Sequence, residues 1–448
     1  MAESNAEGIL KNNLQYTLFS WSKQAGLNPI NAERAEGCYV YTHEGKKYLD
    51  FCSQLFNVNL GHSHPKVLAA MKKQLEKLCY VYPGMATEPR GLLGKKLAEI
   101  TPKNLTKTFF TLGGAEAVEN AIKVARMYSG RHKIITRYRS YHGATMGAIS
   151  AGGDPRRHPV DQNAMPGIVH VEDPYCYRCP WTKTISSCDY ECVKHIERVI
   201  LFENPENIAA ILMEGESGTS GCIKYPPEYW QRIKKIAEKH RILLISDEVM
   251  SGFGRCGNWF AIQNSGVEPD MICMAKGITS AYIPLGALIV SNEIAEFFNE
   301  HTMNIGLTQS AYALGCATAL ACLQVYEEEK LIENTWNMGK YLEDQIEVLK
   351  RRHICIGDFR NTGLLGCLEL VKNRETKEPL VPWNCKPSEM GVMAKIIKKI
   401  RDLGMYTFVK WNWIFIAPPL NVTKDDIDNG LAIISKALIL ADDVCKGE

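Results

Sequence analysis

The sequence lacks the features of a membrane protein or a secreted protein. No apolar run in its 448 residues approaches the ~18 residues that a membrane-spanning helix needs. The N-terminal stretch MAESNAEGILKNNLQ contains no basic segment followed by an apolar core, which a secretory signal requires. We therefore expect a cytoplasmic protein, in which the 16 cysteines are reduced thiols.

The sequence also lacks an excess of charge of one sign. Its 52 Lys and Arg residues nearly balance its 50 Asp and Glu residues, so the formal net charge is +2. This balance gives no electrostatic reason to expect nucleic acid or a membrane surface as a partner. The hydrophobic content of 46% and the charged content of 23% are ordinary for a globular chain. Small molecules are the expected partners.

Two charged residues follow short apolar runs in the middle of the chain. Asp247 follows ILLIS, and Lys276 follows MICMA. Both runs are predicted to be buried parallel strands, and ligands of α/β proteins collect at the carboxyl ends of such strands. A carboxylate and a lysine in this position suit pyridoxal phosphate, because the carboxylate keeps the pyridine nitrogen protonated while the lysine forms a Schiff base.

The segment around these two residues resembles a family signature. DEVMSGFGRCGNWFA followed by AKGITSAYIPLGA is similar to the signature of the class III aminotransferases, and the resemblance extends from GCYVYTHEGKKYLDF to IAPPLNVTKDDID. It implies an α/β enzyme of fold type I, whose large domain has a mainly parallel sheet sandwiched by helices. A small α+β domain is expected from both chain ends. We place an N-terminal arm and part of the small domain at 1–64, the large cofactor-binding domain at 65–324 and the C-terminal small domain at 325–448.

A glycine turn upstream is the predicted phosphate site. The segment KTFFTLGGAEAVENAIKVARMYSG is predicted to be a strand, a turn and a helix that ends at Gly130. Free N–H groups at a helix start bind anions, and Gly113 and Gly114 let the backbone approach one closely. With Ala115 they match the phosphate loop of the family.

The resemblance implies four further cofactor contacts within one chain. Tyr141 is expected to stack on the pyridine ring, and Val249 to close its opposite face. His142 could be a catalytic base, but the resemblance favours structural support of the cofactor site. Glu214, at the end of the apolar strand IAAILME, is also expected at the cofactor.

One cofactor contact is expected from a neighbouring subunit. In the family segment that resembles NIGLTQSAYALGCATALACL, a threonine reaches the phosphate of the partner's cofactor, and Thr308 fills that position. The resemblance therefore implies a homodimer.

Two residues are predicted to bind the substrate. Trp21 could simply pack the N-terminal arm on the body of the protein, but in related ω-aminotransferases this arm covers the active site. Arg156 and Arg157 form an adjacent pair, which is often solvated. An acidic substrate needs a planar cationic fork, however, and Arg156 is our choice for it.

The chain departs from many class III relatives at a gate for dicarboxylates. In those relatives a glutamate pairs with a switch arginine, which lies two residues before the APPL motif. Here Thr219 stands at the position of the glutamate and Phe415 at that of the arginine. Gly215 and Ser217 replace a proline and an amide-bearing residue that many relatives have nearby. The departure weakens the case for a 4-aminobutyrate or ornithine activity. It is similar to the pattern of taurine aminotransferases.

The resemblance, together with these residues, implies a ping-pong transamination of an ω-amino acid. The leading reaction is taurine and 2-oxoglutarate giving sulfoacetaldehyde and L-glutamate, with Lys276 and Asp247 as the catalytic residues. Lys276 would move a proton between the substrate carbon and C4′ of the cofactor. Pyruvate as acceptor, or β-alanine or a diamine as donor, is a close alternative. A decarboxylase or an aminomutase on the same fold is an alternative of another class.

A loop with four cysteines raises the question of a metal. The spacing C-x2-C-x8-C-x3-C is formed by Cys176, Cys179, Cys188 and Cys192. Four thiolates at this spacing could bind a structural zinc ion. Reduced thiols need no metal in a reducing compartment, and the resemblance does not imply zinc. We therefore expect no metal, with zinc as the alternative.

Overall fold

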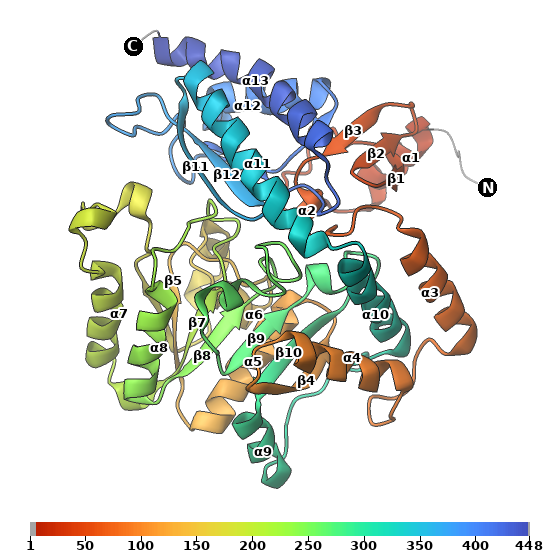
Figure 1. The fold of residues 1–448 in the computed structure, drawn as a ribbon, viewed down its shortest axis with the longest axis vertical. Coiled ribbons are helices and arrows are strands. Elements are labelled where there is room, and N and C mark those ends of the chain that lie inside the picture. The colour runs from red at the N-terminus through yellow and green to blue at the C-terminus, as the bar shows by residue number, and fades with distance from the viewer. Residues whose placement is uncertain (1–5, 447–448) are drawn as a thin grey trace.

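The computed structural model describes residues 6–446, and its centre is a sheet of seven strands (Figure 1). The strand order is β4-β10-β9-β8-β7-β5-β6. The strands are β4 (Leu105–Thr111), β5 (Lys133–Arg137), β6 (Ile168–Val171), β7 (Ile208–Glu214), β8 (Leu243–Asp247), β9 (Met271–Met274) and β10 (Gly286–Ser291). Neighbours from β6 to β9 pair in parallel, whereas β10 is antiparallel to β9 and β4. The mainly parallel sheet of the fold type I prediction is confirmed.

Helices cover both faces of this sheet, which explains why its central strands β7 and β8 are buried along nearly their whole length. Adjacent strand residues such as Ile134 and Ile135 belong to two separate cores. One core includes α5 (Gly114–Ser129) and α9 (Asn292–Glu300), and the other includes α7 (Glu191–Phe202) and α8 (Tyr229–His240). The remaining helices of the chain's first three quarters are α1 (Ala6–Tyr16), α2 (Ser53–Phe56), α3 (Pro65–Lys77), α4 (Glu88–Ile100), α6 (Met146–Ala151) and α10 (Ala313–Glu328).

The C-terminal part of the chain forms a smaller α+β layer above the large sheet (Figure 1). Its antiparallel sheet has the order β11-β12-β15-β14. The strands are β11 (Ile356–Thr362), β12 (Leu365–Leu370), β14 (Val409–Lys410) and β15 (Trp413–Ile416), and the helices are α11 (Leu331–Arg352), α12 (Gly391–Asp402) and α13 (Lys424–Lys446). Thr423 precedes α13, and its hydroxyl accepts the N–H of Asp426 at 3.2 Å, as a helix cap does.

A third sheet joins the two ends of the chain. It contains the N-terminal strands β1 (Ala32–Glu36), β2 (Tyr39–Thr42) and β3 (Lys47–Asp50) together with β13 (Met405–Tyr406). Met405 pairs with Leu49 in parallel, whereas β2 and β3 form an antiparallel hairpin. None of the helices within residues 6–446 is long and apolar enough to cross a membrane.

Candidate active site

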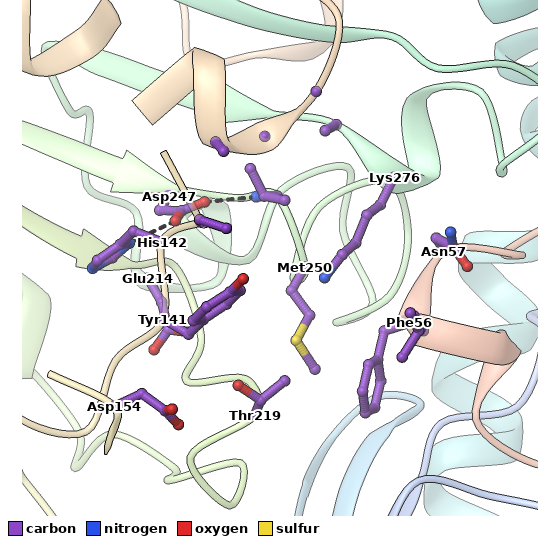
Figure 2. Close-up of a pocket in the computed structure, with 18 of the residues that line it drawn as sticks. Phe56, Asn57, Tyr141, His142, Asp154, Glu214, Thr219, Asp247, Met250 and Lys276 are labelled. Atoms are coloured by element: carbon purple, nitrogen blue, oxygen red, sulfur yellow. Dashed lines mark hydrogen bonds and ion pairs between the residues drawn. The ribbon is translucent and has the colours of Figure 1, made fainter. Parts of the chain in front are cut away.

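A cavity of about 890 Å³ opens at the carboxyl ends of β7, β8 and β9 (Figure 2). Glu214 and Asp247 are the last residues of β7 and β8, and Lys276 follows β9 after one residue. Eleven predicted site residues line this cavity: Trp21, Gly113, Gly114, Ala115, Tyr141, His142, Arg156, Glu214, Asp247, Val249 and Lys276. The fold thus gathers residues from six separate stretches of the chain at one edge of the sheet.

Asp247 is fixed in orientation by its neighbours. Oδ2 lies 2.7 Å from Nδ1 of His142, and Oδ1 accepts the N–H of Val249 at 3.0 Å. His142 is itself held from behind, because its Nε2 lies 3.3 Å from the hydroxyl of buried Thr136. A buried carboxylate held in this way can support a protonated ring nitrogen, and the contact with His142 fixes its orientation.

Lys276 has the environment of a reactive amine. Figure 2 shows its side chain extending into the cavity. Burial lowers its pKa to about 8, although the charges of Asp247 and Glu214 oppose that shift. An amine that titrates close to neutral pH is a better nucleophile and a better proton carrier than an ordinary lysine.

The start of α5 offers an anion site without a side-chain cap. No side chain caps α5 at Gly113, and Gly113, Gly114 and Ala115 line the cavity, so free N–H groups at the helix start can bind an anion there. Gly114 packs tightly on the residue opposite, since a Cβ there would lie 2.5 Å from Cγ1 of Val249. The start of α5 and the side chain of Val249 are therefore packed against each other on one wall of the cavity.

Glu214 belongs to a buried ion-pair network that the sequence analysis missed. Its Oε2 accepts a hydrogen bond from Nη2 of Arg137 at 3.0 Å, and Nη1 of Arg137 lies 3.5 Å from Asp173. Burial raises the pKa of Glu214 to about 7, with the charge of Arg137 opposing the shift. Arg137 ends β5 and Glu214 ends β7, and these two strands are parallel neighbours. A charged residue at the end of each strand is the sequence pattern that could have predicted this ion pair.

The two predicted substrate residues lie together. The guanidinium carbon of Arg156 is 3.7 Å from the ring centroid of Tyr141 and 5.8 Å from that of Trp21. Arg156 donates from Nε to Asp154 at 2.7 Å and from Nη2 to the Thr219 hydroxyl at 3.1 Å. Arg156 therefore lines the cavity with its guanidinium held in a fixed position.

Other lining residues escaped the sequence analysis. Among them are Asp154, next to Arg156, and Lys410, whose Nζ forms an ion pair with Asp154. Lys410 lies between Val409 and Trp411 in a largely apolar stretch, and a lone lysine in such a stretch is the sequence signal that could have pointed to it. Figure 2 labels three more such residues, Phe56, Asn57 and Met250.

The position of the family's switch arginine is part of an aromatic cluster. Phe415 is fully buried, and its ring centroid lies 5.5 Å from that of Phe56 and 5.3 Å from that of Phe408. Phe56 and Phe408 line the cavity. An apolar wall therefore occupies the side of the cavity from which a switch arginine would act.

Thr308 lies outside the cavity of the single chain. It is exposed, and its carbonyl accepts a hydrogen bond from the Tyr80 hydroxyl at 2.7 Å. Its contact with a partner's cofactor stays a prediction.

The four-cysteine loop surrounds a separate small cavity of about 40 Å³. The Cys188 thiol donates to the Glu191 carboxylate at 3.1 Å. Across residues 6–446 no group of three or more His, Cys, Asp or Glu side chains is arranged to hold a metal ion.

A mainly parallel sheet with a buried carboxylate and a partly buried lysine at its carboxyl edge defines a pyridoxal phosphate enzyme of fold type I. The class III aminotransferase profile matches residues 21–438, and the chain belongs to this family of pyridoxal phosphate-dependent aminotransferases.

Individual relatives differ in their named activities. The chain is 36% identical over 419 residues to an adenosylmethionine-8-amino-7-oxononanoate aminotransferase of Methanocaldococcus jannaschii, covering 88% of this chain and 89% of the relative. It is 32% identical over 454 residues to a probable gamma-aminobutyrate transaminase of Oryza sativa, covering 97% and 92%. Among solved structures, the taurine:2-oxoglutarate aminotransferase of Bifidobacterium kashiwanohense in complex with PLP and glutamate superposes with a TM-score of 0.95, 37% identity and 99% coverage of both chains.

Proposed function

We propose that the protein transfers the amino group of taurine to 2-oxoglutarate, giving sulfoacetaldehyde and L-glutamate. The observation that carries this proposal is the placement of Arg156 beside Trp21 and Tyr141 on the cavity wall, with Phe415 at the switch position. A permanent cation suits substrates that all end in an acid: a sulfonate in taurine, and a carboxylate in 2-oxoglutarate and glutamate. The structural similarity to an enzyme solved with glutamate supports this choice.

The chain's own groups divide the work of the transfer. When bound, the cofactor supplies the electron sink that makes a proton on the amine-bearing carbon acidic. Asp247 would hold the ring nitrogen, the start of α5 the phosphate, and Tyr141 and Val249 the two ring faces. Lys276, with its pKa near 8, would take the proton from the substrate carbon and return it at the neighbouring C4′ atom.

Arg156 would orient the substrate for this proton transfer. Its guanidinium is held in place by Asp154 and Thr219. A sulfonate or carboxylate bound there would leave the amine end of the substrate directed toward Lys276. This arrangement needs no movement of an arginine between the two half-reactions, because both substrates present an acidic tail to the same cation.

The active unit is proposed to be a cytoplasmic homodimer. Thr308, in the role expected from the resemblance, would contact the phosphate of the partner's cofactor. Its neighbour Tyr80 is 43% exposed in the single chain, as are Tyr82 (68%) and Met85 (56%). Large apolar side chains that are exposed together mark a surface suited to a second subunit.

The test is the absorption spectrum of the cofactor-loaded protein, recorded with one amine at a time and no acceptor. Taurine should convert the yellow cofactor to the pyridoxamine phosphate form, and 2-oxoglutarate should reverse the change more effectively than pyruvate. Conversion by β-alanine or a diamine alone would keep the aminotransferase and reject taurine. Conversion by no amine would favour a decarboxylase or an aminomutase.

A further inference from the structure

We propose that Lys410 is a second substrate-binding cation, which together with Arg156 forms a two-cation site for the acidic tail of the substrate. This inference rests on the proposed function. It adds a specificity-determining residue that comes from the smaller C-terminal domain. This residue lies far along the chain from Asp247 and Lys276.

The two cations reach the same carboxylate from different parts of the molecule. Arg156 lies in the short 3-10 helix Pro155–Asn163 that follows α6, whereas Lys410 ends β14 in the C-terminal sheet. Arg156 donates to Oδ1 of Asp154 and Lys410 donates to Oδ2. Both cations also contact Thr219: Arg156 at its hydroxyl and Lys410 at its carbonyl, 3.4 Å away.

The charges in this cluster do not cancel. One carboxylate, that of Asp154, faces two cations, so the cluster carries one excess positive charge. The Asp154 side chain is 3% exposed, that of Lys410 is 13% exposed and that of Arg156 is 25% exposed. An excess charge with little access to water is stabilised by a counter-ion, and a monoanionic substrate tail supplies one.

The cluster also has donors left for a ligand. Within residues 6–446, the bonds described above use two of the three N–H groups of the Lys410 ammonium and leave Nη1 of Arg156 without a protein acceptor. Both residues line the cavity. A sulfonate, with three oxygens, or a carboxylate, with two, can accept from both cations at once.

The electrostatic environment of Lys410 suits contact with an anion. Burial lowers its pKa to about 8 and the neighbouring Arg156 acts in the same direction, while Asp154 and, more weakly, Glu214 oppose the shift. The ring of Trp411, 4.3 Å from Nζ, also favours the charged form. An anion bound beside Lys410 would add to the groups that keep it protonated.

The experiment compares Lys410→Met, which removes the amine but keeps the side-chain length, with Lys410→Arg, which keeps the charge. Lys398→Met is the matched control, since the Lys398 side chain is 77% exposed and forms an ion pair with Asp402 on α12. The cofactor-loaded proteins are titrated with propane-1-sulfonate, which has the acidic tail without an amine, and their kcat and KM for taurine are measured. We expect Lys410→Met to weaken sulfonate binding and raise the KM for taurine about tenfold to a hundredfold, with kcat changed much less. Lys410→Arg should recover most of both losses.

The outcomes separate this inference from the proposed function. If the wild-type protein converts taurine and Lys410→Met binds propane-1-sulfonate as tightly as the control does, the two-cation site is refuted and the proposed function stands. If the wild-type protein converts another acidic amine instead, the same comparison is made with that amine. A protein that neither converts an acidic amine nor binds the sulfonate overturns both. Unchanged cofactor absorption and thermal stability of the variants show that the loss is one of binding and not of folding.

Discussion

The carboxylate of Asp247 and the imidazole of His142 meet 2.7 Å apart at the end of β8, and both side chains are buried. The imidazole thereby holds the carboxylate in the orientation that faces the cavity. His142→Phe removes this partner, and a hydrogen bond to a charged group contributes about 1.5–3 kcal/mol.

We therefore expect His142→Phe to weaken cofactor affinity about tenfold to a hundredfold, measured by equilibrium dialysis of pyridoxal phosphate. Thr136→Val, which removes only the 3.3 Å contact behind the imidazole, should have a smaller effect. Equal affinity of His142→Phe and the wild type would show that Asp247 needs no such support.

The adjacent glycines at the start of α5 should respond differently to an added methyl group. A Cβ on Gly114 would lie 2.5 Å from Cγ1 of Val249, whereas a Cβ on Gly113 meets no protein atom within 4 Å. Gly114→Ala should lower the stability of the cofactor-free protein by about 1–3 kcal/mol, the usual cost of overpacking. Gly113→Ala is the control, and thermal unfolding of the two cofactor-free variants measures the difference. Similar unfolding temperatures would mean that Val249 moves aside freely.

Arg156 and Arg157 are neighbours in sequence with separate roles. Arg156 faces the cavity, whereas Arg157 pairs with Asp161 at 2.6 Å and does not line it. Arg156→Ala should raise the KM for taurine about tenfold to a hundredfold, because it removes a charge-assisted contact, and should leave the cofactor absorption unchanged. Arg157→Ala should leave the KM close to that of the wild type. Loss of the cofactor from Arg156→Ala would contradict a role in substrate binding.

Glu369 in β12 should make stability depend on acid pH. It is 1% exposed, and its carboxylate accepts from Arg178 at 2.5 Å, from Arg360 at 2.8 Å and from the Tyr175 hydroxyl. Burial alone would raise its pKa, but the charges of Arg360 and Arg178 outweigh burial and lower it. The stabilisation is therefore present above the unfolded-state pKa of about 4.3 and is lost as the pH falls through the lower folded-state pKa.

Glu369→Gln should destabilise the protein at neutral pH by about 3–5 kcal/mol, the cost of breaking a buried ion pair. It should also remove part of the loss of stability seen in acid. Denaturant unfolding at pH 7 and at lower pH values measures both effects, and Glu375→Gln, at an exposed position, is the control. An acid profile identical to that of the wild type would exclude Glu369 as the titrating group.

The cofactor side of the site could be predicted from the sequence because its chemistry is local. Asp247 and Lys276 each end an apolar strand, and the parallel pairing of β8 with β9 brings the two ends to one edge. Gly113 and Gly114 mark a helix start in the same way. Hydrophobic runs and the glycines of a turn are sufficient to predict where such residues lie.

The substrate side was only partly predictable because its contacts join distant segments. Asp154 and Lys410 are 256 residues apart in sequence. No spacing rule relates them, and their contact depends on how the C-terminal sheet sits on the large one. Arg156 was chosen from its chemistry, whereas Lys410 required the fold.

The antiparallel strand β10 was not predicted, although its short connection has a physical meaning. Only residues 275–285 separate β9 from β10. A parallel crossover needs about a dozen residues or more, usually with a helix, so the chain returns in the opposite direction. Lys276 lies in this short return segment, which ties it to strands on both sides.

The parallel pairing of Leu49 with Met405 has a consequence for synthesis of the chain. The first hairpin emerges from the ribosome early, but the strand that completes its sheet emerges only after about 350 further residues, at a rate of roughly 5–20 residues per second. Through that interval the edge of β3 is an open template for pairing with another chain. Nascent protein that stalls before residue 405 therefore exposes an unpaired strand edge that can aggregate, and the first hairpin of the chain waits for its last partner strand until nearly the whole chain has been made.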